Sequence, residues 1–217
     1  MKKAWILLIL LIIPFITTRE ETLPVNLEYY NKVTEVKIDF RKTLNHILVY
    51  ESYYANVKAD KGKETYAGIS RRFNPDWYGW KYIDQYKKEK GRINRYQRLP
   101  ELDFWVLDYY LDIWVKEEFY KFKDQDIVNY VFDLRINSNR GGVKLICKTL
   151  QKFNYYHTSK KMTTGIIEDI NKIDSKLFLK ELRKNRIAYY YTLVRRDKSQ
   201  KQFINHWIKR ANYIQTL

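Results

Sequence analysis

Glu51 is the residue whose surroundings in this 217-residue chain best suit acid–base chemistry. It ends an apolar stripe of Phe40, Leu44 and Ile47, at steps of three and four, which places its carboxyl group on the inward face of a helix. Burial there disfavours the charged form, and the negative end of the helix dipole acts in the same direction. A carboxyl group that stays protonated near neutral pH can donate a proton to the leaving oxygen of a glycosidic bond. Spacing alone leaves an alternative open, in which Glu51 turns to the helix rim and pairs with a lysine.

The segment after Glu51 has a matching pattern of polar residues and glycines. Residues 54–70 lose the helical period, which is typical of a loop or a short β-hairpin. From Glu51 to Ser70 the sequence resembles the glycoside hydrolase family 108 pattern E-G-G-Y-V-N-x-x-x-D-P-G-G-E-T-x-x-G-I-T, which surrounds the catalytic glutamate of that family. The positions that match in type are Glu51, Tyr54, Asn56, Asp60, Gly62, Glu64, Thr65, Gly68 and Ile69.

Two later segments extend the resemblance. Tyr110 and Trp114 are similar to the family's Y-x-x-x-W, while Phe132, Asp133 and Asn137 are similar to its F-D-x-x-x-N. Further on, the chain resembles the peptidoglycan-binding domain that usually follows the catalytic one. The residues that carry this second resemblance are Leu150, Gln151, Arg186, Tyr189, Tyr190 and the segment 207–210.

The sequence also departs from the family pattern. Ser52 and Tyr53 replace two glycines, and Lys61 and Lys63 replace a proline and a glycine, so we expect a different loop shape near the substrate. The D-G-x-x-G-x-x-T segment of the second domain is degraded at residues 159–165, which leaves the wall-binding role of that part open.

The resemblance implies a mainly α, lysozyme-like α+β fold, with a helical bundle around an active-site cleft and a short β-hairpin after the catalytic helix. It also implies a phage-type N-acetylmuramidase, or endolysin. Such an enzyme cleaves the β-1,4 bond between N-acetylmuramic acid and N-acetylglucosamine in bacterial peptidoglycan, with Glu51 as the general acid. The rival hypothesis is a non-catalytic wall-binding or structural protein that retains the fold.

Other residues of the motif receive roles on this basis. Asp60 could stabilise the oxocarbenium-like transition state or act as a base toward water, and Thr65 could hydrogen-bond that water. Glu64 is a competing base, although a solvated or lysine-paired carboxylate is the simpler interpretation of that residue. The substrate-binding candidates are Tyr54, Asn56, Tyr66 and Gly68, and we expect exposed tyrosines around Tyr53 and Tyr66 to stack on sugar rings. Trp105, Trp114 and Phe132 are expected to pack in the core.

The first twenty residues resemble an export signal. A positive start, Met1-Lys2-Lys3, precedes an apolar run from Ala4 to Ile16, which is too short for a membrane span of about 20 residues. No small-x-small cleavage site follows, so a cleaved signal peptide and a retained membrane anchor are both open, beside a buried N-terminal helix. We expect export through the inner membrane to the periplasm or outside, with membrane attachment through this segment if it is retained.

Composition limits the classes of ligand and partner that the protein is expected to bind. The net charge of +16 favours polyanions such as an anionic cell wall, but no dense basic block is present, which disfavours a dedicated nucleic-acid site. The single cysteine, Cys147, lies in an apolar run and is expected to be a buried thiol. The three histidines are far apart in sequence, so we expect no metal and no cofactor.

Periodicity and helix boundaries predict a chain rich in helices, because glycine and proline are few and apolar and aromatic residues are many. An Asn74-Pro75 pair is expected to cap the second helix. We expect a catalytic lobe over residues 25–123 and a helical, peptidoglycan-binding-like lobe over 124–217 packed on it. The expected helices are 27–53, 74–88, 100–120, 126–137, 143–153, 175–195 and 199–214.

Overall fold

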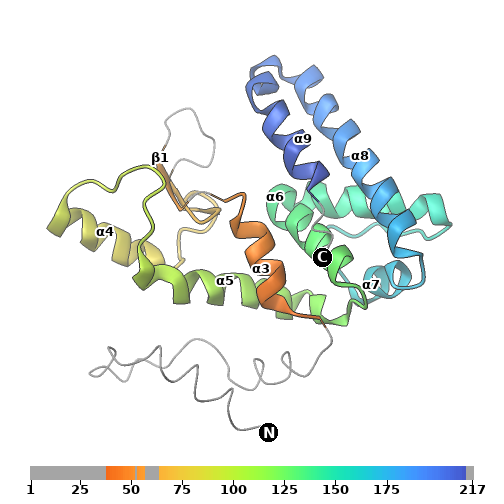
Figure 1. Cartoon of the computed structure of the whole chain (residues 1–217), viewed down its shortest axis with the longest axis horizontal. Coiled ribbons are helices and arrows are strands. Elements are labelled where there is room, and N and C mark those ends of the chain that lie inside the picture. The colour runs from red at the N-terminus through yellow and green to blue at the C-terminus, as the bar shows by residue number, and fades with distance from the viewer. Residues whose placement is uncertain (1–37, 52, 57–63, 214–217) are drawn as a thin grey trace, which may run out of the picture.

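A computed structural model describes residues 38–51, 53–56 and 64–213 of the chain (Figure 1). The described part is mainly helical and contains a three-stranded antiparallel sheet, which confirms the predicted fold class. Its helices are α3 (Phe40–Leu48), α4 (Gly79–Lys90), α5 (Asp103–Lys116), α6 (Gln125–Leu150), α7 (Thr164–Ile170), α8 (Ser175–Arg196) and α9 (Ile204–Asn212). Its strands are β1 (Tyr54–Asn56), β2 (Glu64–Tyr66) and β3 (Ile69–Ser70). Short 3-10 turns are η1 (Pro100–Leu102), η2 (Phe119–Lys121), η3 (Gln151–Phe153) and η4 (Lys198–Phe203).

Helix α3 carries the apolar stripe that the sequence predicted. The Asp39 side chain caps its start by accepting hydrogen bonds from backbone N–H groups of the first turn. Phe40, Leu44 and Ile47 are all buried. The helix ends at Leu48, earlier than predicted, because the chain turns there and two following N–H groups bond back to the carbonyl oxygen of Ile47. The part of the predicted helix before residue 38 lies outside the described residues.

The sheet follows α3, as the loss of helical period predicted. Strands β1 and β2 pair with Tyr54 opposite Tyr66, and β2 turns into β3 through Ala67 and Gly68. Both turn residues have positive φ, 46° at Ala67 and 79° at Gly68. The predicted hairpin is therefore present, with a third short strand added by this tight turn.

The sequence predicted a helix over residues 74–88 that is capped by Asn74. This start was wrong, because α4 begins at Gly79. The Asn74 amide group instead donates to the carbonyl oxygen of Ser70 at 3.1 Å, and its side-chain oxygen accepts from the Tyr109 hydroxyl at 3.2 Å. With both ends of this side chain engaged, residues 71–78 form turns instead of a first helical turn. The helix ends at Lys90, just before Gly91, where a break was predicted.

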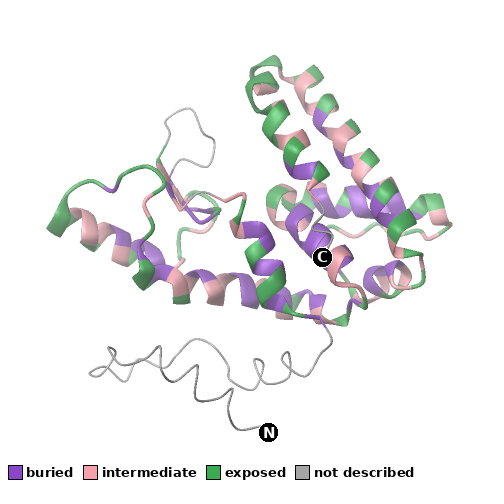
Figure 2. Cartoon of the chain, viewed as in Figure 1, coloured by how far each residue is buried: buried purple, intermediate pink, exposed green. Residues whose placement is uncertain are grey.

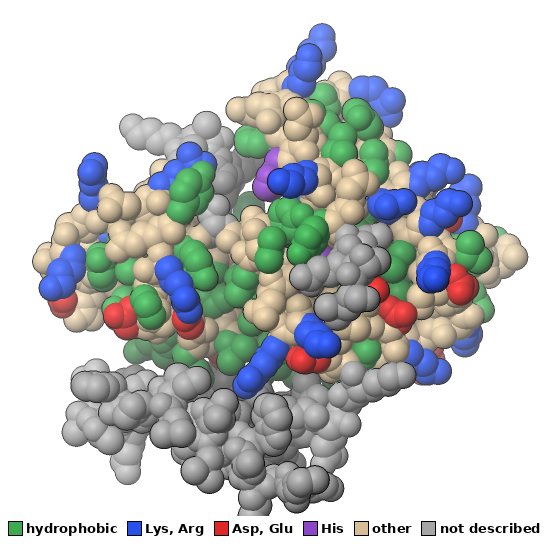
Figure 3. Space-filling view, viewed as in Figure 1, with side chains coloured by type: hydrophobic (Ala, Val, Ile, Leu, Met, Phe, Trp, Pro, Cys, Tyr) green, Lys and Arg blue, Asp and Glu red, His purple; other side chains and the backbone are tan. Residues whose placement is uncertain are grey.

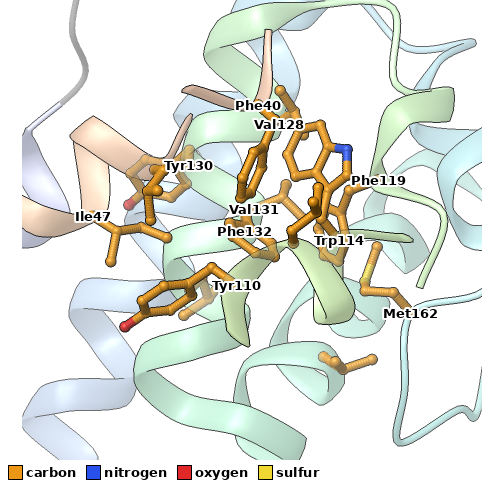
Figure 4. Close-up of a cluster of buried hydrophobic side chains, with 14 of the residues drawn as sticks. Phe40, Ile47, Tyr110, Trp114, Phe119, Val128, Tyr130, Val131, Phe132 and Met162 are labelled. Atoms are coloured by element: carbon orange, nitrogen blue, oxygen red, sulfur yellow. The ribbon is translucent and has the colours of Figure 1, made fainter. Parts of the chain in front are cut away.

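Helices α5 and α6 supply an aromatic core. Trp114, Phe119 and Phe132 are fully buried and their rings lie against one another, with Phe40 of α3 also against Trp114 (Figure 4). Trp114 and Phe132 are therefore core residues, as predicted, while Trp105 is half-buried. The predicted buried thiol of Cys147 is confirmed. Figure 2 shows the same burial pattern along the ribbon, with the outer end of α4 exposed.

Helix α6 contains both of the helices predicted between residues 126 and 153, joined across a kink at Asn139 (φ 43°, ψ −124°). The kink brings the backbone of the second half close to the first, and a Cβ atom at Gly142 would lie 2.4 Å from the carbonyl oxygen of Leu134. Only glycine fits this approach.

The C-terminal helices lie beside the first half of the molecule. Helix α8 packs on α6, and α9 packs along α8 so that its C-terminal end returns toward α3 (Figure 1). The Tyr130 hydroxyl on α6 donates to the carbonyl oxygen of Ala211 at 2.8 Å, which fixes that end of α9. The short helix α7, capped by Thr163, had no counterpart among the predicted helices.

None of the helices in the described ranges is long and apolar enough to cross a membrane. The predicted export segment, residues 1–20, lies outside these ranges.

Candidate active site

Glu51 lies in the turn that follows α3. Its backbone N–H bonds to the carbonyl oxygen of Ile47 at 3.2 Å, and its side chain is 18% exposed. Its Oε1 atom lies 2.8 Å from Nη1 of Arg210 on α9. Glu51 is thus a half-buried carboxylate paired with an arginine from the far end of the chain, and the alternative of a rim glutamate paired with a lysine is not observed.

The turn at Gly68 closes around the other side of Glu51. A Cβ atom at Gly68 would lie 2.8 Å from Cδ and 2.9 Å from Oε2 of Glu51, and 2.8 Å from the Tyr110 hydroxyl oxygen. Because the φ angle of Gly68 is +79°, glycine is required here both for backbone conformation and for space. Gly68 therefore lies close to the Glu51 carboxyl group, while its predicted role in substrate binding stays a prediction.

Tyr110 on α5 lies next to Glu51 and Gly68, and these three residues are called the Glu51 corner. Its side chain is fully buried and its hydroxyl donates to the carbonyl oxygen of Ala67 at 2.7 Å, which holds the turn next to Glu51. Burial, and then the negative charge of Glu51, raise the pKa of Tyr110 well above its usual value. The phenol therefore stays neutral and remains a donor.

Arg210 is held in turn by Asp133 on α6. Its Nε and Nη2 atoms lie 2.9 and 2.6 Å from Asp133 Oδ1, and Arg186 on α8 approaches the same carboxylate at 2.7 Å. Burial alone would raise the pKa of Asp133, but the guanidinium groups of Arg210 and Arg186 lower it below its usual value. Asp133 is therefore a buried anion between two cations, and it fixes the arginine that contacts Glu51.

Glu64, the competing candidate for a catalytic base, occupies a different environment. It is 8% exposed, and its carboxylate accepts a hydrogen bond from the Tyr54 hydroxyl at 2.8 Å. It also forms ion pairs with Arg71, at 2.8 Å, and with Lys87. Both oxygens are thus engaged by cations, which suits a structural role for Glu64.

The tyrosines predicted to bind sugar are placed differently from expectation. Tyr54 and Tyr66 are buried, and the Tyr66 hydroxyl donates to the carbonyl oxygen of Leu99 at 3.0 Å. Burial raises the pKa of Tyr66 to about 12. Neither ring presents a face to solvent, so the expectation that Tyr66 stacks on a sugar is corrected; Tyr53 remains partly exposed, with Arg98 over its ring.

The remaining site candidates lie on or beside the sheet. Thr65 is half-buried, and by strand alternation its side chain points to the opposite face of β2 from Glu64. Asn56 lines an open hollow of about 530 Å³ at the end of β1, together with the basic side chains of Lys87, Arg92 and Arg95. Asp60 and Gly62 lie outside the described residues.

One segment of the chain matches a known protein family. The model of glycosyl hydrolase 108 matches residues 44–138. This segment, somewhat less than half of the chain, is similar to glycosyl hydrolase family 108 and includes Glu51. The solved structure of Brucella abortus SagA is similar in fold, with a TM-score of 0.54 and 17% sequence identity over 82% of this chain and 96% of that chain. No curated protein matches the sequence.

The glycosyl hydrolase 108 segment contains the Glu51 corner and most of its support. Its Y-x-x-x-W residues are Tyr110, which holds the Gly68 turn, and Trp114, which fills the core below. Its F-D-x-x-x-N residues include Asp133, which fixes Arg210, and Asn137, whose side-chain oxygen accepts from the Tyr190 hydroxyl. Tyr110 and Asp133, which are far apart in sequence, therefore both support the surroundings of Glu51, one beside it and the other through Arg210.

Arg210 is the site residue that sequence reasoning missed. It lies beyond the matched residues 44–138, and its only sequence cue was the resemblance of residues 207–210 to a peptidoglycan-binding domain, which remains a prediction. Within the described segments, no three histidine, cysteine or carboxylate side chains lie close enough together to hold a metal ion.

Proposed function

We propose that this protein is a muramidase, a peptidoglycan hydrolase that cleaves the β-1,4 bond between N-acetylmuramic acid and N-acetylglucosamine, with Glu51 as its general acid. The match of residues 44–138 to glycosyl hydrolase 108 supports glycoside hydrolysis and peptidoglycan as the substrate. The observation that carries the assignment of Glu51 is the contact with Gly68. Because Gly68 is exposed and has no Cβ atom to crowd Oε2, we propose that a glycosidic oxygen approaches the Glu51 carboxyl group from this side.

Glu64 is a poor alternative for the same role. Its ion pairs with Arg71 and Lys87 would have to break before it could bind a proton or a water molecule. We therefore propose Asp60 as the second carboxylate of the reaction, stabilising the transition state or acting as base, with Thr65 as a hydrogen-bond partner of the attacking water.

The charge of the protein suits a wall substrate. Lys and Arg side chains are spread across the face shown in Figure 3, in keeping with the net charge of +16. The hollow next to Asn56 adds Arg92 and Arg95 close to the sheet, where they would attract carboxylates of the wall peptides. We propose export through the segment 1–20, which would bring the protein to this substrate, and we expect nucleic acid not to be a partner.

A gel assay tests the proposal. The purified protein is renatured in a gel that contains purified peptidoglycan, and in parallel it is pelleted with insoluble peptidoglycan. A muramidase gives a zone of clearing that Glu51→Gln loses, and it releases soluble reducing sugar. Binding to the pellet by a folded protein, without clearing or soluble product, would instead support a wall-binding protein that retains only the fold.

A further inference from the structure

The guanidinium group of Arg210 divides its donors between two carboxylates. Nη1 faces Glu51 Oε1 at 2.8 Å, while Nε and Nη2 face Asp133 Oδ1 at 2.9 and 2.6 Å. Arg210 is 4% exposed and Asp133 only 1%, and the Tyr50 ring lies 5.6 Å from the guanidinium carbon. An arginine held in this way has little freedom to rotate away from Glu51.

This contact makes the two oxygens of Glu51 unequal. Oε1 forms an ion pair with Nη1 of Arg210, whereas Oε2 faces the exposed Gly68 and no described residue forms an ion pair with it. The nearby Tyr110 hydroxyl is already committed to the Ala67 carbonyl oxygen. A proton on Oε1 would point at an N–H donor, so a protonated Glu51 carries its proton on Oε2.

We propose that Arg210 is a positioning residue that selects Oε2 of Glu51 as the proton-donating atom, so that the C-terminal helix α9 completes the active site. This inference rests on the proposed role of Glu51 as general acid. Since Arg210 lies outside residues 44–138, the segment that matches glycosyl hydrolase 108 does not by itself contain the whole site. The C-terminal helices then contribute to catalysis through the contact of Arg210 with Glu51, whether or not they bind the wall.

The charged and titratable groups around Glu51 come from every element packed against it. Arg210 on α9 and the Tyr110 phenol on α5 face the carboxyl group itself. Behind Arg210 lie Asp133 on α6 and Arg186 on α8, and His46 on α3 faces this same ionic group. Arg210 is the cation that contacts Glu51 in the described part of the chain, and its removal favours the protonated carboxyl group.

The test compares Arg210→Met with Arg186→Met. Each change removes one buried guanidinium group from Asp133, but only Arg210 contacts Glu51. The readouts are kcat, KM and the pH profile on soluble, uncross-linked glycan strands, together with the melting temperature. For Arg210→Met we expect kcat to fall about tenfold or more with little change in KM. The alkaline limb of its profile should move to higher pH than in wild type, because the cation next to the acid has been removed.

Arg186→Met should lose comparable stability and keep the alkaline limb of the wild-type profile. If Arg210→Met does not fold, Arg210→Lys keeps the charge but cannot reach both carboxylates, and it should lower kcat with KM and the alkaline limb retained. A folded Arg210 variant with the kcat and pH profile of Arg186→Met would overturn the inference. Normal turnover by Glu51→Gln would instead overturn the proposed function on which it rests.

Discussion

Two glutamates of one motif, Glu51 and Glu64, have opposite surroundings. Glu64 is buried at the start of β2, where Arg71, Lys87 and the Tyr54 hydroxyl engage both of its oxygens. Glu51 is half-buried at the end of α3, with one oxygen bound to an arginine and the other beside an exposed glycine. Position in a motif therefore does not tell which carboxylate is available for chemistry; the partners do.

The partners also differ in where they come from. Those of Glu64 are local, since Lys87 is 23 residues away and lies on the next helix. The partner of Glu51 comes from α9 and is itself fixed by Asp133. A local cluster stabilises the sheet, whereas the long-range contact couples the C-terminal helices to the carboxyl group that we propose as the acid.

The largest expected effect is that of Glu51→Gln. The amide keeps the size of the side chain but cannot donate a proton as an acid, so hydrolysis of purified peptidoglycan should fall at least about a hundredfold. Circular dichroism and the melting temperature would verify that the fold is retained. Near-normal turnover by the folded variant would remove the distinction between the two glutamates.

Gly68→Ala tests the close approach of Gly68 to the Glu51 carboxyl group. A methyl group here meets Glu51 and Tyr110 at 2.8 Å, so activity should fall about tenfold or more, with a stability cost of roughly 1–3 kcal/mol. Gly91→Ala is the matched control, because Gly91 also has a positive φ of +83° but nothing within 4 Å of its added methyl group. It should lose about 1 kcal/mol of stability and no activity. Equal activity losses in the two variants would mean that backbone strain, and not the Glu51 contact, is responsible.

Glu64→Gln should affect stability more than catalysis. It leaves Arg71 and Lys87 without their shared carboxylate, but their side chains are 32% and 31% exposed, so the loss is discounted to roughly 1–3 kcal/mol. Chemical denaturation would measure it, and turnover per folded molecule should stay within about threefold of wild type. Asp60→Asn should lower hydrolysis more than this. The reverse order would make Glu64, and not Asp60, the partner of Glu51.

The smallest effect concerns charge outside both glutamate corners. A protein of net charge +16 should reach an anionic wall by attraction that is screened over about 8 Å at physiological salt. Hydrolysis of intact walls should therefore decrease as salt rises, while hydrolysis of a short, weakly charged glycan fragment should change much less. Equal salt sensitivity would place the effect of charge at the catalytic site or on stability.

Much of the fold follows from local sequence pattern. The stripe of Phe40, Leu44 and Ile47, the glycines around the β turn and the start of α8 at Ser175 were all predicted, because each depends on residues close in sequence. The start of α4 was not, since the Asn74 side chain is recruited by Ser70 and by Tyr109 on a later helix. Tertiary contacts override a capping pattern in such cases.

The site was less predictable for the same reason. Spacing and the family resemblance led to Glu51 and Gly68, and they allowed for a lysine partner of Glu64, which is Lys87. They could not tell that Tyr66 is buried or that Arg71 also pairs with Glu64. The contact between Glu51 and Arg210 depends on how α9 packs. The periodicity of either segment does not predict this packing. Long-range ion pairs of this kind become visible only once the helices are placed in space.

Analysis of the reaction products is the most direct test of the proposal that the protein is a muramidase with Glu51 as its general acid. Purified peptidoglycan is digested with wild-type protein and with Glu51→Gln, the products are reduced with borohydride, and mass spectrometry identifies the sugar at each new reducing end. Wild type should give reduced N-acetylmuramic acid, and the Glu51→Gln digest should contain almost none. Reduced N-acetylglucosamine from wild type, or equal amounts of product from both proteins, would contradict the assignment.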